Sequence, residues 1–392
     1  MTTVYTNRHR MNIWIDENIP FAEEIFGDFG RLTFFDGRHF PIDTAKESGI
    51  EVLITRSVTP VTAQIADIGS LRFVGSATIG TDHVDVSALQ KRGVAFVHAP
   101  GANAQSVAEY VLCAMAELHY LKTIIENDQK VGVVGYGQVG RRVTTLLSRL
   151  GARVLVFDPF VDVPHRQNVA QSDSIDEIMT LPVVTVHVPL THSGPHPTVA
   201  MLDEKKLSKL PENALFINTS RGGTMRAADL IKAVNQDNAR AWILDVWPNE
   251  PSVPLALLEW MKTHRERAIG TPHIAGHSVD GKVGGALMVA RQLAQFLKKS
   301  WQPPALPLAE PMNIVVDDQK SPYEMLETVL TTVYPIRQQS DAFVSCGASV
   351  QEQFDQLRRA IAPRREFRFH HVTTKHGQLK QWLKALGFQV TG

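Results

Sequence analysis

The sequence is poor in cysteine: Cys113 and Cys346 are the only two in 392 residues. Two thiols can form neither a disulfide framework nor a cysteine-rich metal site. A chain with so few cysteines is typical of a reducing compartment. We therefore expect a cytoplasmic protein with no structural metal.

The sequence also lacks an excess of charge of either sign, since Lys and Arg together number 40 and so do Asp and Glu. Proteins that bind nucleic acids or membrane surfaces through charge need a positive field. No apolar run reaches the ~18 residues of a membrane span. We expect neither nucleic acid nor membrane as a partner.

The first ten residues, Met1 to Arg10, lack the apolar segment of a secretory signal, and we expect them to form a flexible extension. Hydrophobic residues make up 44% of the chain, which is enough for a full core and excludes disorder for most of it. At ~150 residues per domain, the length favours two or three domains.

Short apolar runs alternate with helical patterns from Asn12 to about Ser300. This alternation indicates βαβ units, and continuously apolar strands are typical of parallel sheets covered on both faces. We predict an α/β fold with two doubly wound parallel sheets. The predicted strands are Ile13–Ile15, Val52–Thr55, Arg72–Val74, Val94–Val97, Val131–Val134, Arg153–Phe157, Val183–His187, Ala214–Asn218, Ala241–Leu244 and Ala268–Gly270.

Two long helical patterns, Ser106–Leu121 and Val283–Lys299, stand on either side of the second series of strands. As crossovers, they would make the first domain discontinuous, with the second inserted in it. The proline-rich segment Trp301–Pro311 is predicted to be a linker. A small α+β unit follows, with strands predicted at Phe367–Val372 and Phe388–Val390. We predict a discontinuous first domain of residues 11–102 and 282–300, and an inserted second domain of residues 103–281. The linker comprises residues 301–311, and the C-terminal unit comprises residues 312–392.

A glycine motif follows the predicted strand Val131–Val134 and opens a helical pattern. Gly135 would permit a tight turn, Gly137 would let the backbone approach a pyrophosphate, and Gly140 would allow close packing of helix on strand. The helix N-terminus would offer N–H groups to the phosphates. A glycine-rich turn is the simpler alternative, but strand, motif and helix arrive in register, so we predict a dinucleotide site.

An acidic residue, Asp158, ends the next predicted strand, eighteen residues past Gly140. This position suits hydrogen bonds from an adenosine ribose. A carboxylate there would repel a 2′-phosphate, so the sequence favours NAD over NADP. Arg141 and Arg142 lie nearby and make this choice the weaker inference.

Three chemically complementary residues, Arg221, Glu250 and His273, follow three successive predicted strands. Ligands of open parallel sheets bind beyond the carboxyl ends of the strands. A histidine can accept a hydroxyl proton near neutral pH, a carboxylate can orient its ring, and an arginine fork can hold a substrate carboxylate. This set suits the oxidation of a 2-hydroxy acid, with hydride passing to the nicotinamide.

Each of these residues has a plainer explanation, because a lone histidine after a strand is more often structural. Their joint placement favours catalysis. Asp245 could bond the nicotinamide carboxamide. The cluster Asp82, His83 and Asp85 suggests a metal site, but it has no further ligands in register, so a structural loop is favoured.

The motifs around these residues resemble those of the D-isomer-specific 2-hydroxyacid dehydrogenases. They are Gly135–Gly140 with Asp158, Asn218–Gly222 (NTSRG), Leu244–Pro251 (LDVWPNEP) and Thr271–Gly276 (TPHIAG). Other stretches resemble the branch of this family that acts on 4-phospho-D-erythronate: Ile15–Pro20, Thr55–Thr59, Phe73–Asp85, Ala99–Asn103, Ala108–Val111, Phe354–Arg358 and Arg364–Phe367.

The resemblance implies a flavodoxin-like substrate domain, a Rossmann NAD domain and a C-terminal domain that builds a homodimer. It implies NAD-dependent oxidation of a phosphorylated 2-hydroxy acid in pyridoxal 5′-phosphate biosynthesis, with Arg221, Glu250 and His273 as active-site residues. A phosphoglycerate or glyoxylate dehydrogenase, or a corepressor-like NAD(H) sensor, remains an alternative. The other implied contacts are Gln138, Val139, Val188, Thr219, Ser220, Asp245 and Gly276 for the cofactor, and Arg56, Ser57, Thr78 and His277 for the substrate.

Two positions depart from the family pattern. The family's substrate-contacting tyrosine directly after HIAG is His277 here, and Val188 stands where the family often has threonine. A ring nitrogen could still meet a phosphate at the first position, whereas the second loses a hydroxyl contact to the cofactor.

Overall fold

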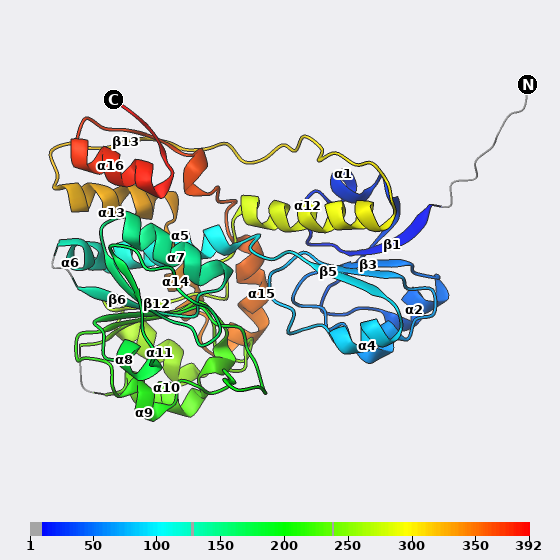
Figure 1. Cartoon of the computed structure of the whole chain (residues 1–392), viewed down its shortest axis with the longest axis horizontal. Coiled ribbons are helices and arrows are strands. Elements are labelled where there is room, and N and C mark those ends of the chain that lie inside the picture. Colours follow the sequence, from blue (N-terminus) through cyan, green and yellow to red (C-terminus); the bar gives the residue numbers. More distant parts are fainter. Residues whose placement is uncertain (1–9, 127–128, 237–238) are drawn as a thin grey trace, which may run out of the picture. The chain divides into compact units, whose positions relative to one another are not determined.

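The computed structural model describes residues 10–126, 129–236 and 239–392. The chain divides into two compact units, the first made of Met1–Asn103 with Val279–Leu308 and the second of Ala104–Ser278 with Ala309–Gly392 (Figure 1). The predicted flexible extension falls, apart from Arg10, outside the described residues.

Unit 1 holds a five-stranded parallel sheet in the described residues, in the order β2-β1-β3-β4-β5 (Figure 1). This is the flavodoxin-like order that the sequence predicts. Its strands are β1 (Met11–Asp16), β2 (Gly30–Phe35), β3 (Val52–Thr55), β4 (Phe73–Ser76) and β5 (Ala95–His98). Strand β2 was not predicted from the sequence, because it is an edge strand whose middle residues are only partly buried.

Alternating side chains of this sheet enter two apolar layers. Ile13 and Ile15 pack with α1 (Ala22–Phe26) and α12 (Val279–Phe296) on one face. Trp14 and Leu53 pack on the other face, where the covering helices are α2 (Ile42–Glu47), α3 (Ala63–Ala66) and α4 (Val86–Lys91). Because all the strands are parallel, their carboxyl ends lie at the same edge of the sheet.

Unit 2 contains, within the ranges described, a seven-stranded parallel sheet in the order β12-β11-β10-β9-β6-β7-β8. The strand order reverses at the adjacent strands β6 and β9, because β7 and β8 lie on one side of β6 while β9 to β12 lie on the other. This is the arrangement of the predicted Rossmann fold. The strands are β6 (Lys130–Val134), β7 (Arg153–Phe157), β8 (Val169–Gln171), β9 (Val183–Val186), β10 (Leu215–Asn218), β11 (Ala241–Leu244) and β12 (Ala268–Gly270). The short edge strand β8 was not predicted.

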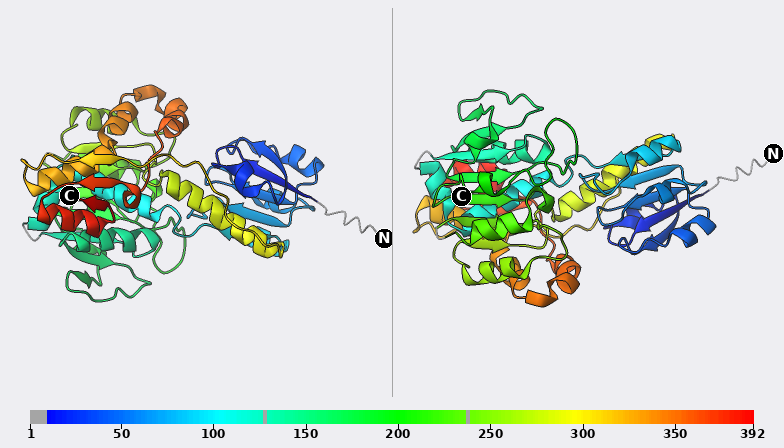
Figure 2. Two further views of the ribbon diagram at one scale, coloured as in Figure 1. Left: turned by 90° about the horizontal axis from the view of Figure 1, so that it is seen from above. Right: turned by 90° about the horizontal axis from the view of Figure 1, so that it is seen from below.

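The two faces of this sheet are covered by different helices (Figure 2). Leu215 and Ile217 face one layer, and Phe216 between them faces the other. The first layer holds α5 (Ala104–Glu117), α6 (Tyr120–Glu126) and α7 (Gln138–Arg149). The second holds α8 (Ile175–Ile178), α9 (Glu204–Leu207), α10 (Ala227–Val234) and α11 (Leu255–Thr263).

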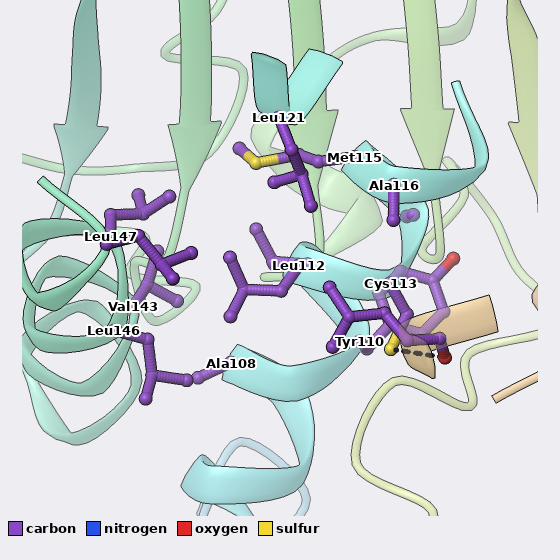
Figure 3. Packing of buried hydrophobic residues seen from close by; sticks show 14 of the residues in the cluster. Ala108, Tyr110, Leu112, Cys113, Met115, Ala116, Leu121, Val143, Leu146 and Leu147 are labelled. Carbon is purple, nitrogen blue, oxygen red and sulfur yellow. Dashed lines mark hydrogen bonds between the residues drawn. The ribbon is translucent and has the colours of Figure 1, made fainter. Parts of the chain in front are cut away.

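Helix α5 is buried on almost all sides, which explains its nearly continuous apolar sequence. Figure 3 shows Ala108 and Leu112 facing Leu146 of α7, with Tyr110 and Cys113 on the opposite side of α5. The prediction of one helix over Ser106–Leu121 is wrong, because the chain turns at His119, whose φ is 59°, before α6 begins.

The C-terminal residues add a small parallel sheet, β13-β14-β15, and four helices to the described part of unit 2 (Figure 1). The strands are β13 (Asn313–Val315), β14 (His371–Thr373) and β15 (Gln389–Thr391), and the helices α13 (Pro322–Val333), α14 (Ile336–Val344), α15 (Val350–Ala360) and α16 (Gly377–Leu386). The sequence missed β13 and α14. The strand predicted at Phe367–Val372 is too long, because Phe367–Phe369 forms a 3₁₀ turn.

Apolar side chains of α13 and α16 join the same buried layer as α5 and α7. Most of the C-terminal segment is therefore packed on the Rossmann sheet of unit 2. In the described parts of the chain, no helix combines the length and hydrophobicity that a membrane crossing requires.

Candidate active site

The glycine motif forms a tight turn between β6 and α7. Gly135 has φ 94°, a conformation that favours glycine. A Cβ at Gly140 would lie 1.9 Å from the Gly135 carbonyl oxygen, so only glycine lets the helix approach the turn this closely. A Cβ at Gly137 would meet no atom within 4 Å. Space is therefore open at Gly137, as a pyrophosphate on the N-terminus of α7 requires.

Asp158 lies beside this turn, at the end of β7. Its Oδ2 accepts a hydrogen bond from the Tyr136 backbone N–H at 2.7 Å, and its Oδ1 accepts one from the Phe160 N–H at 2.9 Å. Arg141 and Arg142 donate to backbone oxygens of the motif, those of Tyr136 and Gln138. The carboxylate is thus fixed where an adenosine ribose could donate a hydrogen bond to it. The hydrogen bonds of both arginines stabilise the backbone of the glycine turn.

A buried histidine follows β9 and was missed by the sequence analysis. His187 lies with Nε2 2.9 Å from Thr185 Oγ1 and Nδ1 3.2 Å from Thr219 Oγ1. Burial lowers the pKa of His187 to about 3, so the ring is neutral at physiological pH. It orients Thr219, one of the predicted cofactor contacts, and Val188 follows it directly in the chain.

The loop after β10 carries Ser220 and Arg221 and is held by the strand's last residue, Asn218. Asn218 Oδ1 accepts hydrogen bonds from the backbone N–H and the hydroxyl of Ser220, at 3.0 and 2.7 Å. Arg221 Nη1 donates to the Ser220 carbonyl at 2.9 Å. A Cβ at Gly222 would lie 1.8 Å from the Trp247 carbonyl oxygen. Glycine here lets the Arg221 loop touch the next loop, which leads to Glu250.

His273 and Glu250 form a short hydrogen bond across two loops. The distance from His273 Nδ1 to Glu250 Oε1 is 2.5 Å, while Glu250 Oε2 accepts a hydrogen bond from the Trp247 N–H. Burial would raise the pKa of Glu250, but the charge and hydrogen bond of His273 bring it below its ordinary value. The carboxylate therefore fixes the proton on Nδ1, and Nε2 is the nitrogen left to exchange a proton.

Asp245 supports the same histidine loop from inside the protein. It is 1% exposed and accepts hydrogen bonds from the Thr271 hydroxyl and from the Ile274 and Ala275 N–H groups, at 2.7, 2.7 and 2.9 Å. Burial raises the pKa of Asp245, against the opposing charge of His273 and these hydrogen bonds. Contact with a nicotinamide carboxamide stays a prediction for this residue. The structure shows it as the support of the loop.

The predicted residues Gly276 and His277 close the histidine loop. His277 N–H donates to the Ile274 carbonyl at 2.8 Å, and Ser278 N–H donates to the Gly276 carbonyl. These hydrogen bonds form a tight turn directly after His273, and both residues are partly exposed. Arg221, Glu250 and His273 therefore lie on neighbouring loops of unit 2, at the carboxyl ends of β10, β11 and β12.

The substrate contacts predicted in unit 1 also follow adjacent strands. Arg56 and Ser57 come after β3, and Thr78 comes after β4, where its hydroxyl lies 2.9 Å from Ser76 Oγ. Arg56 Nε is 3.0 Å from Oδ1 of the fully buried Asp16, at the end of β1. Asp16 was missed as a site residue, although an acid that ends an apolar strand is a usable signal. The pair orients the guanidinium at this edge of the sheet.

The candidate metal cluster serves other purposes in the structure. His83 Nε2 lies 3.1 Å from Ser76 Oγ, and Asp85 caps α4 by accepting from the Ala88 N–H. Across residues 10–126, 129–236 and 239–392, no group of histidine, cysteine or acidic side chains is arranged to hold a metal ion.

Comparison with known proteins identifies the family. The family model described as D-isomer specific 2-hydroxyacid dehydrogenase, NAD binding domain, matches residues 112–275. The chain is 35% identical over 385 residues to the erythronate-4-phosphate dehydrogenase of Saccharophagus degradans, covering 97% of this chain and 99% of the relative. The chain belongs to the D-isomer-specific 2-hydroxyacid dehydrogenases. It is an NAD-dependent oxidoreductase of 2-hydroxy acids, as the site predicts.

Further relatives extend the likeness over the C-terminal segment. The erythronate-4-phosphate dehydrogenase of Pseudomonas syringae pv. tomato is 36% identical, covering 96% of this chain and 99% of the relative. Residues 306–387 match a second model, described as a domain of unknown function. This dehydrogenase therefore carries the additional C-terminal domain that the sequence predicts.

Solved structures show the same fold over about three quarters of the chain. A D-lactate dehydrogenase from Aquifex aeolicus with NAD and lactic acid has a TM-score of 0.60 at 22% identity, covering 73% of this chain and 96% of its own. An NAD-bound 3-phosphoglycerate dehydrogenase from Entamoeba histolytica also has a TM-score of 0.60 at 22% identity, covering 74% of this chain and 96% of its own.

The close approach at Gly222 predicts that Gly222→Ala lowers both stability and turnover. The added Cβ would overlap the Trp247 backbone and separate the Arg221 loop from the Glu250 loop, at a cost of roughly 1–3 kcal/mol in the free energy of unfolding. Urea denaturation and turnover of NAD measure both effects. Gly223→Ala is the matched control, because its Cβ would meet only the flexible Leu190 side chain at 3.1 Å. Equal effects of the two variants would contradict this account.

The lowered pKa of His187 predicts that the stability of the folded chain depends on pH. Its pKa in the folded chain, about 3, is below the ordinary value of 6.5, so between these values only the unfolded chain takes up the proton. Stability is therefore lost as the pH falls below 6.5, by about 2 kcal/mol at pH 5 for this residue alone. Urea denaturation at pH 7.5 and pH 5 should show a smaller loss for His187→Gln. The exposed His165→Gln should behave as the wild type; a wild-type response of His187→Gln would refute the assignment.

Proposed function

We propose that this chain oxidises 4-phospho-D-erythronate to (R)-3-hydroxy-2-oxo-4-phosphooxybutanoate with NAD, as a step of pyridoxal 5′-phosphate biosynthesis. The observation that carries the proposal is the similarity to erythronate-4-phosphate dehydrogenases, which is 35–36% over nearly the whole chain, C-terminal domain included. The D-lactate and 3-phosphoglycerate dehydrogenases share 22% of residues and cover about three quarters of the chain.

The proton of the substrate hydroxyl passes to His273 Nε2 in this proposal. NAD, when bound, accepts the hydride from C2. Glu250, held to Nδ1 at 2.5 Å, stabilises the imidazolium that forms. Loss of the hydride from carbon and of the proton from oxygen leaves the 2-oxo acid, with the proton on the histidine for later release to solvent.

The cationic and hydroxyl groups bind the charged ends of the substrate. Arg221 provides a planar fork for the carboxylate at C1 and the reacting oxygen. Arg56 and Ser57 supply a cation and a hydroxyl for a phosphate or carboxylate. His277 replaces the family's tyrosine and offers a ring nitrogen to the phosphate. Val188 leaves the cofactor without the hydroxyl contact common in the family.

Two alternatives make different predictions. A phosphoglycerate or glyoxylate dehydrogenase would turn over its own acid in preference to phosphoerythronate. A corepressor-like sensor would bind NADH without turnover of any 2-hydroxy acid. The hydrogen bond of His273 with Glu250 and the presence of Arg221 favour an enzyme over a sensor.

A panel of 2-hydroxy acids tests the proposal. With NAD present, 4-phospho-D-erythronate should be the preferred substrate, followed through the absorbance of reduced nicotinamide. His273→Asn should lower turnover by roughly 10²–10⁴-fold, because the proton acceptor is lost, while the affinity for NADH is retained. Preference for phosphoglycerate or glyoxylate would overturn the proposed substrate, and full activity of His273→Asn would overturn the proposed mechanism.

We also propose that the enzyme is a cytoplasmic homodimer assembled through its C-terminal domain. Both cysteines are free thiols, as a reducing compartment favours. Strand β13 lies at an edge of the C-terminal sheet, and Val315 on it is 81% exposed, with Met312 nearby at 42%. An exposed apolar edge strand is suited to pairing with another chain.

The assembly is testable by sedimentation. Val315→Lys places a charge on the edge strand and should shift a wild-type dimer toward monomer in analytical ultracentrifugation. Val199→Lys, at an exposed valine outside the C-terminal domain, is the matched control and should leave the dimer intact. A monomeric wild type, or a dimer unaffected by Val315→Lys, would contradict the proposed interface.

A further inference from the structure

The loop that carries His273 is held at both ends by helix α5. Ser106 Oγ donates to the Ala275 carbonyl at 3.0 Å, two residues after the histidine. The Tyr110 hydroxyl lies 2.6 Å from Thr271 Oγ1, two residues before it. Because the Thr271 proton is given to Asp245, the hydroxyl of Tyr110 is the donor of this pair. The helix thus supports the histidine from both sides.

A single side chain of the C-terminal domain contacts Ser106 directly and is linked to Tyr110 through the ring of Tyr334. Arg364 is buried, and its Nη2 donates to Ser106 Oγ at 2.5 Å. Its Nη1 donates to Glu109 Oε2 at 2.8 Å, forming an ion pair between two buried side chains. The guanidinium also lies 4.4 Å from the ring centre of Tyr334, which packs against the Tyr110 ring at 5.8 Å.

The donor and the acceptor of each of these hydrogen bonds can be assigned. Ser106 has one hydroxyl proton, and since its oxygen accepts from Arg364, that proton is directed to the Ala275 carbonyl. Glu109 also accepts from the Phe367 N–H at 3.0 Å, three residues after Arg364, which ties the C-terminal backbone to α5. A displacement of Arg364 would therefore reach the loop through one intervening side chain.

The histidine needs such support because its backbone is strained. His273 has φ 56°, a left-handed conformation that non-glycine residues seldom adopt and that persists only where the surroundings enforce it. In this conformation His273 Nδ1 meets Glu250. Relaxation of the loop would remove the catalytic geometry before it unfolded the sheet.

We propose that Arg364 and Ser106 are positioning residues, through which the C-terminal domain holds His273 in its catalytic conformation. They act through the loop and contact neither substrate nor cofactor in this assignment. The C-terminal domain then contributes to turnover as well as to assembly. The inference rests on the proposed function for the catalytic role of His273 and for the substrate used in the assay.

The chain offers a matched control in a second arginine. Arg337, on α14, also pairs with a glutamate of α5, Glu117, at 3.1 Å. Its Nη1 donates to the carbonyls of Arg265 and Ala268, which precede or begin β12 and lie away from the histidine loop. Loss of this pair should cost stability without moving His273.

Turnover distinguishes positioning from a structural role. Arg364→Lys keeps the charge beside Glu109, and Ser106→Ala removes only the hydroxyl, so both variants should fold. Each should lower kcat by roughly 10-fold or more, because a small misplacement of the histidine is costly. The KM for NAD should be unchanged, and the primary isotope effect with C2-deuterated substrate should increase. The two control variants, Arg337→Lys and Ser172→Ala, should retain the wild-type kcat although their Tm falls by an amount similar to that of the test variants. Ser172→Ala removes a buried hydroxyl that is hydrogen-bonded to Ser174 and Glu177.

Amide hydrogen exchange supplies a readout that needs no substrate. The Ile274 and Ala275 N–H groups should exchange faster in Arg364→Lys and Ser106→Ala than in the two controls. Equal kcat and equal exchange in all four variants would overturn the inference. A wild type inactive on 4-phospho-D-erythronate would count against the proposed function instead, and exchange at these two amides would then decide the inference alone.

Discussion

The buried carboxylate of Asp245 organises the edge of the sheet where the reactive side chains lie. A charge that is 1% exposed is stable only when hydrogen bonds replace its lost water, and the donors come from Thr271, Ile274 and Ala275. These three hydrogen bonds hold the loop tightly around the strained backbone of His273. The conformation of His273 thus depends on the hydrogen bonds that the buried carboxylate requires, and so does the contact of His273 with Glu250.

Close backbone approach is the second constraint on the site. Gly140 admits the helix to the phosphate-binding turn, and Gly222 admits the Arg221 loop to the backbone of Trp247. Neither position has room for a Cβ. The parallel sheet brings the ends of its strands to one edge, but these glycines set how near the following loops can come. Arg221, Glu250 and His273 therefore lie on neighbouring loops although they are separated along the chain.

The regular parts of the fold are readable from the sequence because burial on both faces leaves a strong signal. Strands β3, β7 and β11 contain the continuous apolar runs Val52–Ile54, Val154–Phe157 and Ala241–Leu244, and their predicted bounds agree with the structure. Edge elements lack that signal: β2 includes Arg31 and Thr33, β8 has three residues, and the polar first half of α14 hides its buried face. The break at His119 was also hidden, since a left-handed histidine leaves no mark in the apolar pattern.

By itself, the sequence determined the fold class, the glycine turn before α7 and the loops that carry Arg221, Glu250 and His273, because these depend on local patterns and on the common edge of a parallel sheet. Tertiary structure alone decided the partners of those residues. The Arg364–Glu109 pair joins side chains 255 positions apart. Asp16 meets Arg56 only because β1 and β3 are neighbours in the sheet. Such contacts require packed elements to bring distant side chains within hydrogen-bonding distance, and no local pattern along the chain encodes that distance.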